Sequence, residues 1–267
     1  TSGWTEDEVL LNDPADDRKL IAEAVKVARQ ADVILLAVGG NEQTSREAWA
    51  STHMGDRTDL QLVGLQDELI NALAKTGKPI AAFVFNGRPL AFTNLIEKVD
   101  AVFECWYLGQ EAGLAVADVL FGDFNPSGKL PISIPRSVGH IPAYYNYKPS
   151  ARRGYLFDDA SALFPFGYGL SYTTFEISDV VLSNKEMKAD GNSTLSVEVT
   201  NTGKVNGAEV VQLYVRDHFS SVTRPVKELK GFKRVTLLPG ETKKVEFEIS
   251  FDELAFNDIS IDFAVDP

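Results

Sequence analysis

Short apolar runs alternate with segments of helical periodicity in the first half of the chain. Three runs predict strands that are buried on both faces; they cover residues 33–38, 80–85 and 101–107. Apolar residues recur at helical spacing in four other segments, which cover residues 14–28, 65–74, 90–97 and 112–120. The alternation of helices and strands predicts a mainly parallel sheet with helices on both faces, an α/β sandwich.

The pattern changes after Gly122. Residues 123–170 are rich in Pro, Gly and Tyr and have little periodicity, so we expect an extended connection that lies over the α/β domain. From Phe175 onward, short segments alternate apolar and polar residues between turn signals, which predicts an all-β sandwich. The clearest of these segments are residues 195–199, 210–215 and 245–249.

The length of 267 residues favours two domains. We expect an entry linker over residues 1–12, an α/β domain over 13–172 with 123–172 as its extended connection, and a β-sandwich over 173–267. The last strand-like piece, residues 259–265, runs into the end of the chain. We therefore expect the β-sandwich to be truncated at its C-terminus.

Charge and cysteine content exclude several classes of partner. The net charge of −12 argues against nucleic acid or an anionic membrane surface. The single cysteine, Cys105, excludes an internal disulfide and lies in an apolar run, where we expect a buried structural thiol. No apolar stretch is long enough to span a bilayer, and no signal peptide is visible. Periplasm, exterior and cytoplasm stay open, and we favour a periplasmic or secreted location.

A polar loop after the first predicted strand is the place where we expect chemistry. Gly39-Gly40 ends the strand, and the loop then carries Glu42, Glu47 and charged or aromatic neighbours. Carboxylates beside an aromatic ring and arginines are typical of a sugar site, although a loop glutamate is more often simply solvated. The neighbours in question are Arg46, Trp49 and Arg57.

Other chemistries are poorly supported. The histidines at positions 53, 140 and 218 lack metal-ligand spacing, so we expect no metal. The Gly39-Gly40-Asn41 turn is not a dinucleotide fingerprint, and no nucleophile elbow is present. We expect no cofactor.

Three longer motifs resemble a known family. They are WYLGQEAG at 106–113, ADVLFGDFNPSGKLP at 117–131 and FPFGYGLSYTTF at 164–175. They are similar to the C-terminal half of glycoside hydrolase family 3 enzymes of the β-glucosidase or β-xylosidase kind. The resemblance implies an α/β sandwich domain followed by a fibronectin type III-like (immunoglobulin-like) β-sandwich, in agreement with the division made above.

The resemblance also implies a divided active site. In the family, an aspartate nucleophile lies in an N-terminal TIM-like barrel domain, and the sandwich domain supplies a glutamate as general acid/base. The position of that glutamate resembles Glu47, with Glu42 as the second choice. Arg46, Trp49 and Arg57 are then expected to bind substrate; Arg57 could instead shape the loop, and Trp49 could be loop packing.

The resemblance implies that this chain is the C-terminal part of an exo-acting, retaining β-glycosidase. The substrates implied are β-glucosides or oligosaccharides, with β-xylosides as the alternative, and the barrel domain of the same enzyme is the expected partner. We expect this chain alone to be inactive, because a covalent glycosyl intermediate needs the missing nucleophile. A non-catalytic carbohydrate-binding or scaffold module is the rival interpretation, and a homodimer is left open.

Overall fold

The computed structural model describes residues 13–47, 55–149, 154–188 and 191–265, and the backbone of residues 3–4 and 9–10. The chain groups into two compact units that interleave along the sequence. The α/β unit comprises Thr1–Ala112, Ile134–Ala143 and Ser161–Phe164, and the β unit comprises Gly113–Ser133, Tyr144–Ala160 and Pro165–Pro267. The expected connection is thus divided between the two units.

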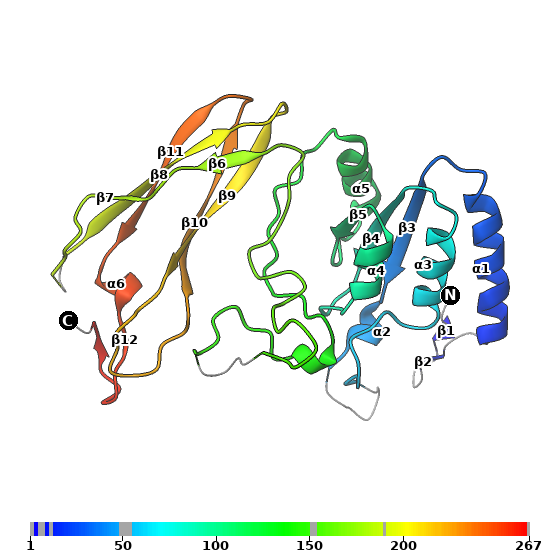
Figure 1. Cartoon of the computed structure of the whole chain (residues 1–267), viewed down its shortest axis with the longest axis horizontal. Helices are drawn as coiled ribbons and strands as arrows, with labels where there is room; N and C mark the ends of the chain where they lie inside the picture. Colours follow the sequence, from blue (N-terminus) through cyan, green and yellow to red (C-terminus); the bar gives the residue numbers. More distant parts are fainter. Residues whose placement is uncertain are drawn as a thin grey trace. The chain divides into compact units, whose positions relative to one another are not determined.

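The α/β unit is built on three parallel strands with β4 in the centre (Figure 1). They are β3 (Ile34–Gly39), β4 (Ile80–Phe85) and β5 (Ala101–Glu104). Leu36 pairs with Ala82, and Ala82 pairs with Val102, so the strands run in register. On one face of the sheet Phe83 and Phe103 stack with ring centroids 4.9 Å apart. The predicted parallel sheet is confirmed.

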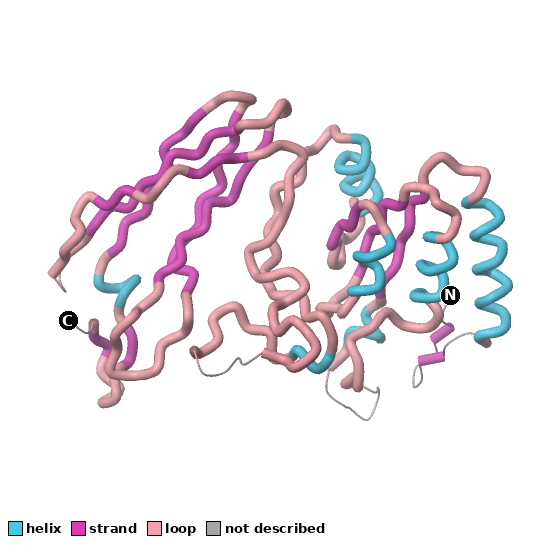
Figure 2. The backbone as a smooth tube through the Cα atoms, in the orientation of Figure 1, coloured by secondary structure: helices cyan, strands magenta, loops and turns pink. Residues whose placement is uncertain are grey.

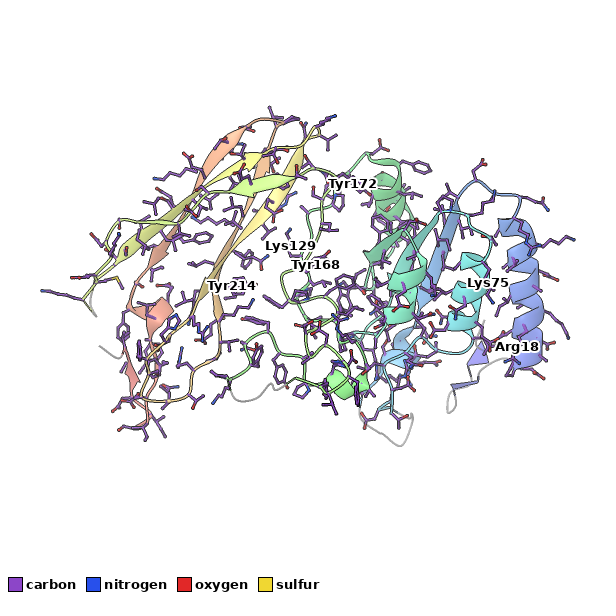
Figure 3. The ribbon with its side chains drawn as sticks, in the orientation of Figure 1. Arg18, Lys75, Lys129, Tyr168, Tyr172 and Tyr214 are labelled. Carbon is purple, nitrogen blue, oxygen red and sulfur yellow. The ribbon has the colours of Figure 1, made fainter. Side chains whose placement is uncertain are left out.

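The helices of the first half of the chain are α1 (Pro14–Ala28), α2 (Glu42–Ser45), α3 (Gln66–Ala74), α4 (Thr93–Lys98) and α5 (Ala112–Phe121). Four of them occur in the predicted order along the chain, and α2 is an additional single turn in the segment predicted as a polar loop; from Gly113 onward, α5 groups with the β unit. Helix α1 begins where the Asp13 carboxylate accepts the Ala15 N–H at 2.8 Å, an N-cap followed by proline in the first turn. Helices α1 and α3 contact each other, and Arg18, labelled in Figure 3, forms a two-bond ion pair with Glu68.

The third strand is shorter than its sequence suggests. The apolar run 101–107 predicts a strand to Tyr107, but β5 ends at Glu104. Trp106 takes a φ of 51°, a left-handed conformation that no strand accommodates. The backbone therefore turns sharply just beyond the sheet, and the Tyr107 side chain becomes part of a loop.

The sandwich of the β unit is made of two antiparallel sheets around a common apolar core. One sheet has the order β11-β8-β6 with β7 also paired to β8, and the other pairs β9 with β10 (Figure 1). The strands are β6 (Phe175–Ile177), β7 (Val181–Leu182), β8 (Ser193–Asn201), β9 (Gly207–Val215), β10 (Glu228–Leu237) and β11 (Thr242–Ile249). Inward residues of β8, β9, β10 and β11 form one buried cluster, which includes Val199, Leu213, Leu237 and Phe247. The predicted β-sandwich is confirmed.

Short elements complete the described chain. They are β1 (Gly3–Trp4), β2 (Val9–Leu10), the 3-10 turn η1 (Val138–His140), α6 (Phe251–Leu254), β12 (Phe256–Asn257) and β13 (Phe263–Ala264). Among the described residues, none of the helices has the length and apolar character needed to cross a bilayer.

Two of the long motifs hold one another inside the β unit. The Leu130 N–H donates to the Tyr168 carbonyl, and the Gly167 N–H donates to the Leu130 carbonyl, both at 2.8 Å. Lys129 forms a 2.8 Å ion pair with Glu209 on β9, and each side chain is only 15% exposed. Figure 2 draws these segments as loop, and Figure 3 labels Lys129 and Tyr168 there. The motifs that carry the family resemblance therefore stabilise an irregular region that lacks helix or strand bonds of its own.

Candidate functional site

Loops from all three parallel strands meet at Ser45. Its hydroxyl lies 2.9 Å from the Tyr107 hydroxyl, which follows β5, and accepts the N–H of Gly87, which follows β4, at 3.2 Å. Gly87 fits because it has no side chain: a Cβ there would lie 2.6 Å from the Tyr107 ring and 3.0 Å from Ser45 Cβ. We call residues 40–47, 86–89 and 105–107 the carboxyl-edge loops, since each follows the carboxyl end of a strand.

Glu47 lies on the solvent-exposed side of these loops. Its Oε1 lies 3.0 Å from Nη1 of Arg88, and its side chain is 66% exposed, whereas the Arg88 side chain is only 7% exposed. Nη2 of Arg88 donates to the carbonyl of Arg46. A buried cation thus holds the backbone just before Glu47 and one oxygen of its carboxylate, and leaves the carboxylate accessible.

A buried asparagine supports the turn that carries this arginine. Asn86 is 1% exposed, and its Nδ2 donates to the carbonyl of Arg88 at 2.6 Å. Among the described residues, Nε of Arg88 and Oδ1 of Asn86 have no hydrogen-bond partner. The guanidinium therefore has its described partners on residues 46 and 47.

Glu42 has a different environment. It lies in α2, a single turn that Asn41 caps together with the hydroxyl of Thr44. Nε and Nη2 of Arg46 contact the two Glu42 oxygens at 2.7 and 2.9 Å, across one helical turn. Both carboxylate oxygens of Glu42 are thus engaged by one guanidinium on the helix surface, unlike those of Glu47.

The two predicted sugar-binding arginines are both engaged within their own loops. Nη2 of Arg57 donates to Asp59 at 2.8 Å and to the carbonyl of Gln61 at 2.7 Å, and its side chain is 19% exposed. These bonds favour a loop-shaping role for Arg57. Trp49 and His53 lie outside the described residues. Binding of substrate by Arg46, Trp49 and Arg57 stays a prediction.

Glu104 and Cys105 lie at the end of the third strand. Burial raises the pKa of Glu104 to about 7, and the weak 3.4 Å bond from the Trp106 N–H opposes this only in part. Burial, followed by the charge of Glu104, raises the pKa of the Cys105 thiol to about 11. The expectation of a buried thiol is confirmed, and such a thiol is a poor nucleophile at neutral pH.

A hollow of about 550 Å³ lies beside the start of the loop that follows β3. Its lining comes from α1, α3 and the end of β3, and includes Leu20, Ala37 and Gln66. Gly40, Asn41 and Thr44 of the loop after β3 also line this hollow, whereas Glu42 and Glu47 do not.

Arg88 is a site residue that the sequence pattern did not single out. The segment Asn86-Gly87-Arg88-Pro89 directly follows β4 and is a bend without helix or strand structure. The available signal was a charged residue directly after a buried central strand, at the sheet edge where ligands gather. Its partners lie more than forty residues earlier in the chain, so local patterning could not reveal them.

Comparison with known proteins gives a consistent result. Residues 8–172 match the Glycosyl hydrolase family 3 C-terminal domain, and residues 209–267 match a fibronectin type III-like domain. The chain therefore belongs to glycosyl hydrolase family 3, and the predicted fold class and family are confirmed.

Individual relatives agree with this membership. The chain is 47% identical to a periplasmic β-glucosidase of Salmonella typhimurium over 98% of its own length and 35% of that protein. It is 49% identical to a β-xylosidase of Formosa agariphila over 92% of its own length and 34% of that protein. A β-glucosidase structure from Erythrobacter marinus superposes with a TM-score of 0.95 at 44% identity, covering 99% of this chain and 35% of that one. The chain thus spans about a third of the length of these relatives.

The raised pKa of Glu104 predicts a pH-dependent stability. Between pH 4.5 and about 7 the folded chain keeps a proton that the unfolded chain has lost. The contribution of Glu104 to the free energy of unfolding is therefore fully present below pH 4.5. It is lost as the pH rises through this window, by roughly 3 kcal/mol in total. Glu104→Gln, which stays neutral, should flatten this dependence.

Urea denaturation of both proteins at about pH 5 and about pH 8 measures the effect. Tryptophan fluorescence reports on the α/β unit selectively, because Trp4, Trp49 and Trp106 all fall within its Thr1–Ala112 segment. An equal loss of stability in the two proteins between these pH values would contradict the assignment.

Proposed function

We propose that this chain is the C-terminal part of a retaining, exo-acting β-glycosidase that hydrolyses terminal β-D-glucosyl residues. Glu47 supplies the general acid/base, and an N-terminal barrel domain outside this chain supplies an aspartate nucleophile. The observation that carries the proposal is the placement of Glu47: an accessible carboxylate held at the carboxyl edge of a parallel sheet by a buried arginine. The greater length of the β-glucosidase relatives supports a further domain.

Glu47 acts twice in this scheme. In the first step it donates a proton to the glycosidic oxygen while the nucleophile attacks the anomeric carbon, and a covalent glycosyl-enzyme forms. In the second step the carboxylate takes a proton from the water that releases the sugar. Both steps need a carboxylate that reaches solvent and substrate, which the 66% exposure of Glu47 allows.

Two alternatives differ in testable ways. The similarity to the Formosa agariphila β-xylosidase supports a β-xyloside as the second substrate, and relative rates on 4-nitrophenyl β-glucoside and β-xyloside separate the two sugars. A non-catalytic carbohydrate-binding or scaffold module would hydrolyse neither. We also propose a periplasmic or secreted location, which the name of the Salmonella typhimurium relative supports.

Replacement of Glu47 should impair the acid step most. In the full-length enzyme, Glu47→Ala should slow substrates with poor leaving groups by about 10²- to 10⁴-fold, because these need a proton donor. Substrates with good leaving groups, such as 2,4-dinitrophenyl β-glucoside, should lose less in their first step. Azide should restore part of the rate on the activated substrate by replacing the water that needs a base.

Glu42→Ala is the matched control in the same loop. It should remove the surface pair with Arg46 and leave the leaving-group dependence unchanged. If Glu42→Ala instead shows leaving-group dependence and azide rescue, the acid/base assignment belongs to Glu42.

The purified chain by itself should not turn over 4-nitrophenyl β-glucoside. The covalent intermediate needs the barrel nucleophile, so mixing with a separately produced barrel domain is the condition under which activity is expected. Turnover by the isolated chain that disappears with Glu47→Ala would mean that the nucleophile lies within these 267 residues.

A further inference from the structure

We propose that Arg88 is the positioning residue for the Glu47 carboxyl group. This inference rests on the proposed function, in which Glu47 is the general acid/base. Arg88 fixes Oε1 through the 3.0 Å contact with Nη1, and the proton exchanged with substrate and water is carried on the other oxygen, Oε2. Arg88 itself need not touch the sugar.

The two ends of the pair have opposite environments. The Arg88 side chain is 7% exposed, so its charge has lost most of its hydration and depends on protein partners. Those partners are the Arg46 carbonyl and the Glu47 carboxylate. Because an unpaired buried cation is costly, the arginine draws the 46–47 segment toward the turn after β4.

The turn after β4 binds three consecutive residues of the loop 40–47, which we call the acidic loop. The Gly87 N–H donates to Ser45 Oγ, Nη2 of Arg88 binds the carbonyl of Arg46, and Nη1 of Arg88 binds Glu47. The turn after the central strand β4 thus fixes the position of residues 45–47 in the loop that follows β3.

Two further contacts support the turn that carries Arg88, one buried and one exposed. Asn86, 1% exposed, donates to the Arg88 carbonyl at 2.6 Å. Tyr107, from the loop after β5, reaches the same Ser45 hydroxyl that Gly87 binds. A rigid support of this kind is what an acid/base group needs, because a displacement of about 1 Å can cost on the order of 100-fold in rate.

A comparison of variants in the full-length enzyme tests the proposal. Arg88→Met should lower kcat on poor leaving groups by about 10- to 100-fold and change KM little, while activated substrates lose less. Azide should give little rescue, since the carboxylate is still present. Arg88→Lys, which can reach one of the two partners but not both, should recover part of the loss.

Arg18→Met is the matched control, because it removes an arginine–glutamate pair of 2.9 Å whose two side chains are both about half exposed. It should leave the kinetics unchanged. A uniform loss of rate across leaving groups in Arg88→Met, or no recovery in Arg88→Lys, would overturn the positioning role.

Amide hydrogen exchange on the isolated chain gives a readout that does not need activity. Arg88→Met should speed exchange in peptides that cover residues 42–47, and Arg18→Met should not; unchanged exchange in Arg88→Met would overturn the proposal. The two proposals fail differently. If Glu47→Ala lacks the leaving-group pattern, the proposed function fails, whereas a normal Glu47→Ala pattern beside an unaffected Arg88→Met enzyme refutes only the role of Arg88.

Discussion

The parallel pairing of β4 with both of its neighbours is the constraint on which the α/β unit depends. Parallel strands end at the same edge of a sheet, so the loops after β3, β4 and β5 are forced together there. The convergence of Gly87 and Tyr107 on Ser45 is a direct result, since the three residues are far apart in the sequence. An antiparallel arrangement would send the middle loop to the opposite edge.

Electrostatics at this edge depends on how charges are buried. Arg88 is desolvated and therefore needs anionic or carbonyl partners, which the acidic loop supplies. Glu104 is desolvated without a cationic partner among the described residues, and its pKa rises. The two groups show the two outcomes open to a buried charge: it is paired, or it is neutralised near physiological pH.

Much of this fold follows from local sequence patterns, and the failures have physical causes. The run at 80–85 predicts β4 in full, because a central buried strand is apolar throughout. Strand β10 was not predicted: it carries charges at Lys230, Lys233 and Arg234, and a register shift between Leu229 and Gly231 interrupts the alternation. In the site, sequence patterns and the family resemblance indicated the acidic loop and Glu47. They could not indicate Arg88, whose contacts with residues 46 and 47 arise only when β3 and β4 are paired.

Gly39 fixes the point at which the acidic loop leaves strand β3. It has a φ of 131°, and a Cβ there would lie 1.9 Å from the Phe85 carbonyl oxygen. Gln66 also binds both its N–H, at 2.7 Å, and its carbonyl, at 2.8 Å. The acidic loop is therefore pinned at residue 39 and again at residues 45–47. Loop grafting that keeps these attachment points at residues 39 and 45–47 should therefore keep the Glu47 carboxylate where it is.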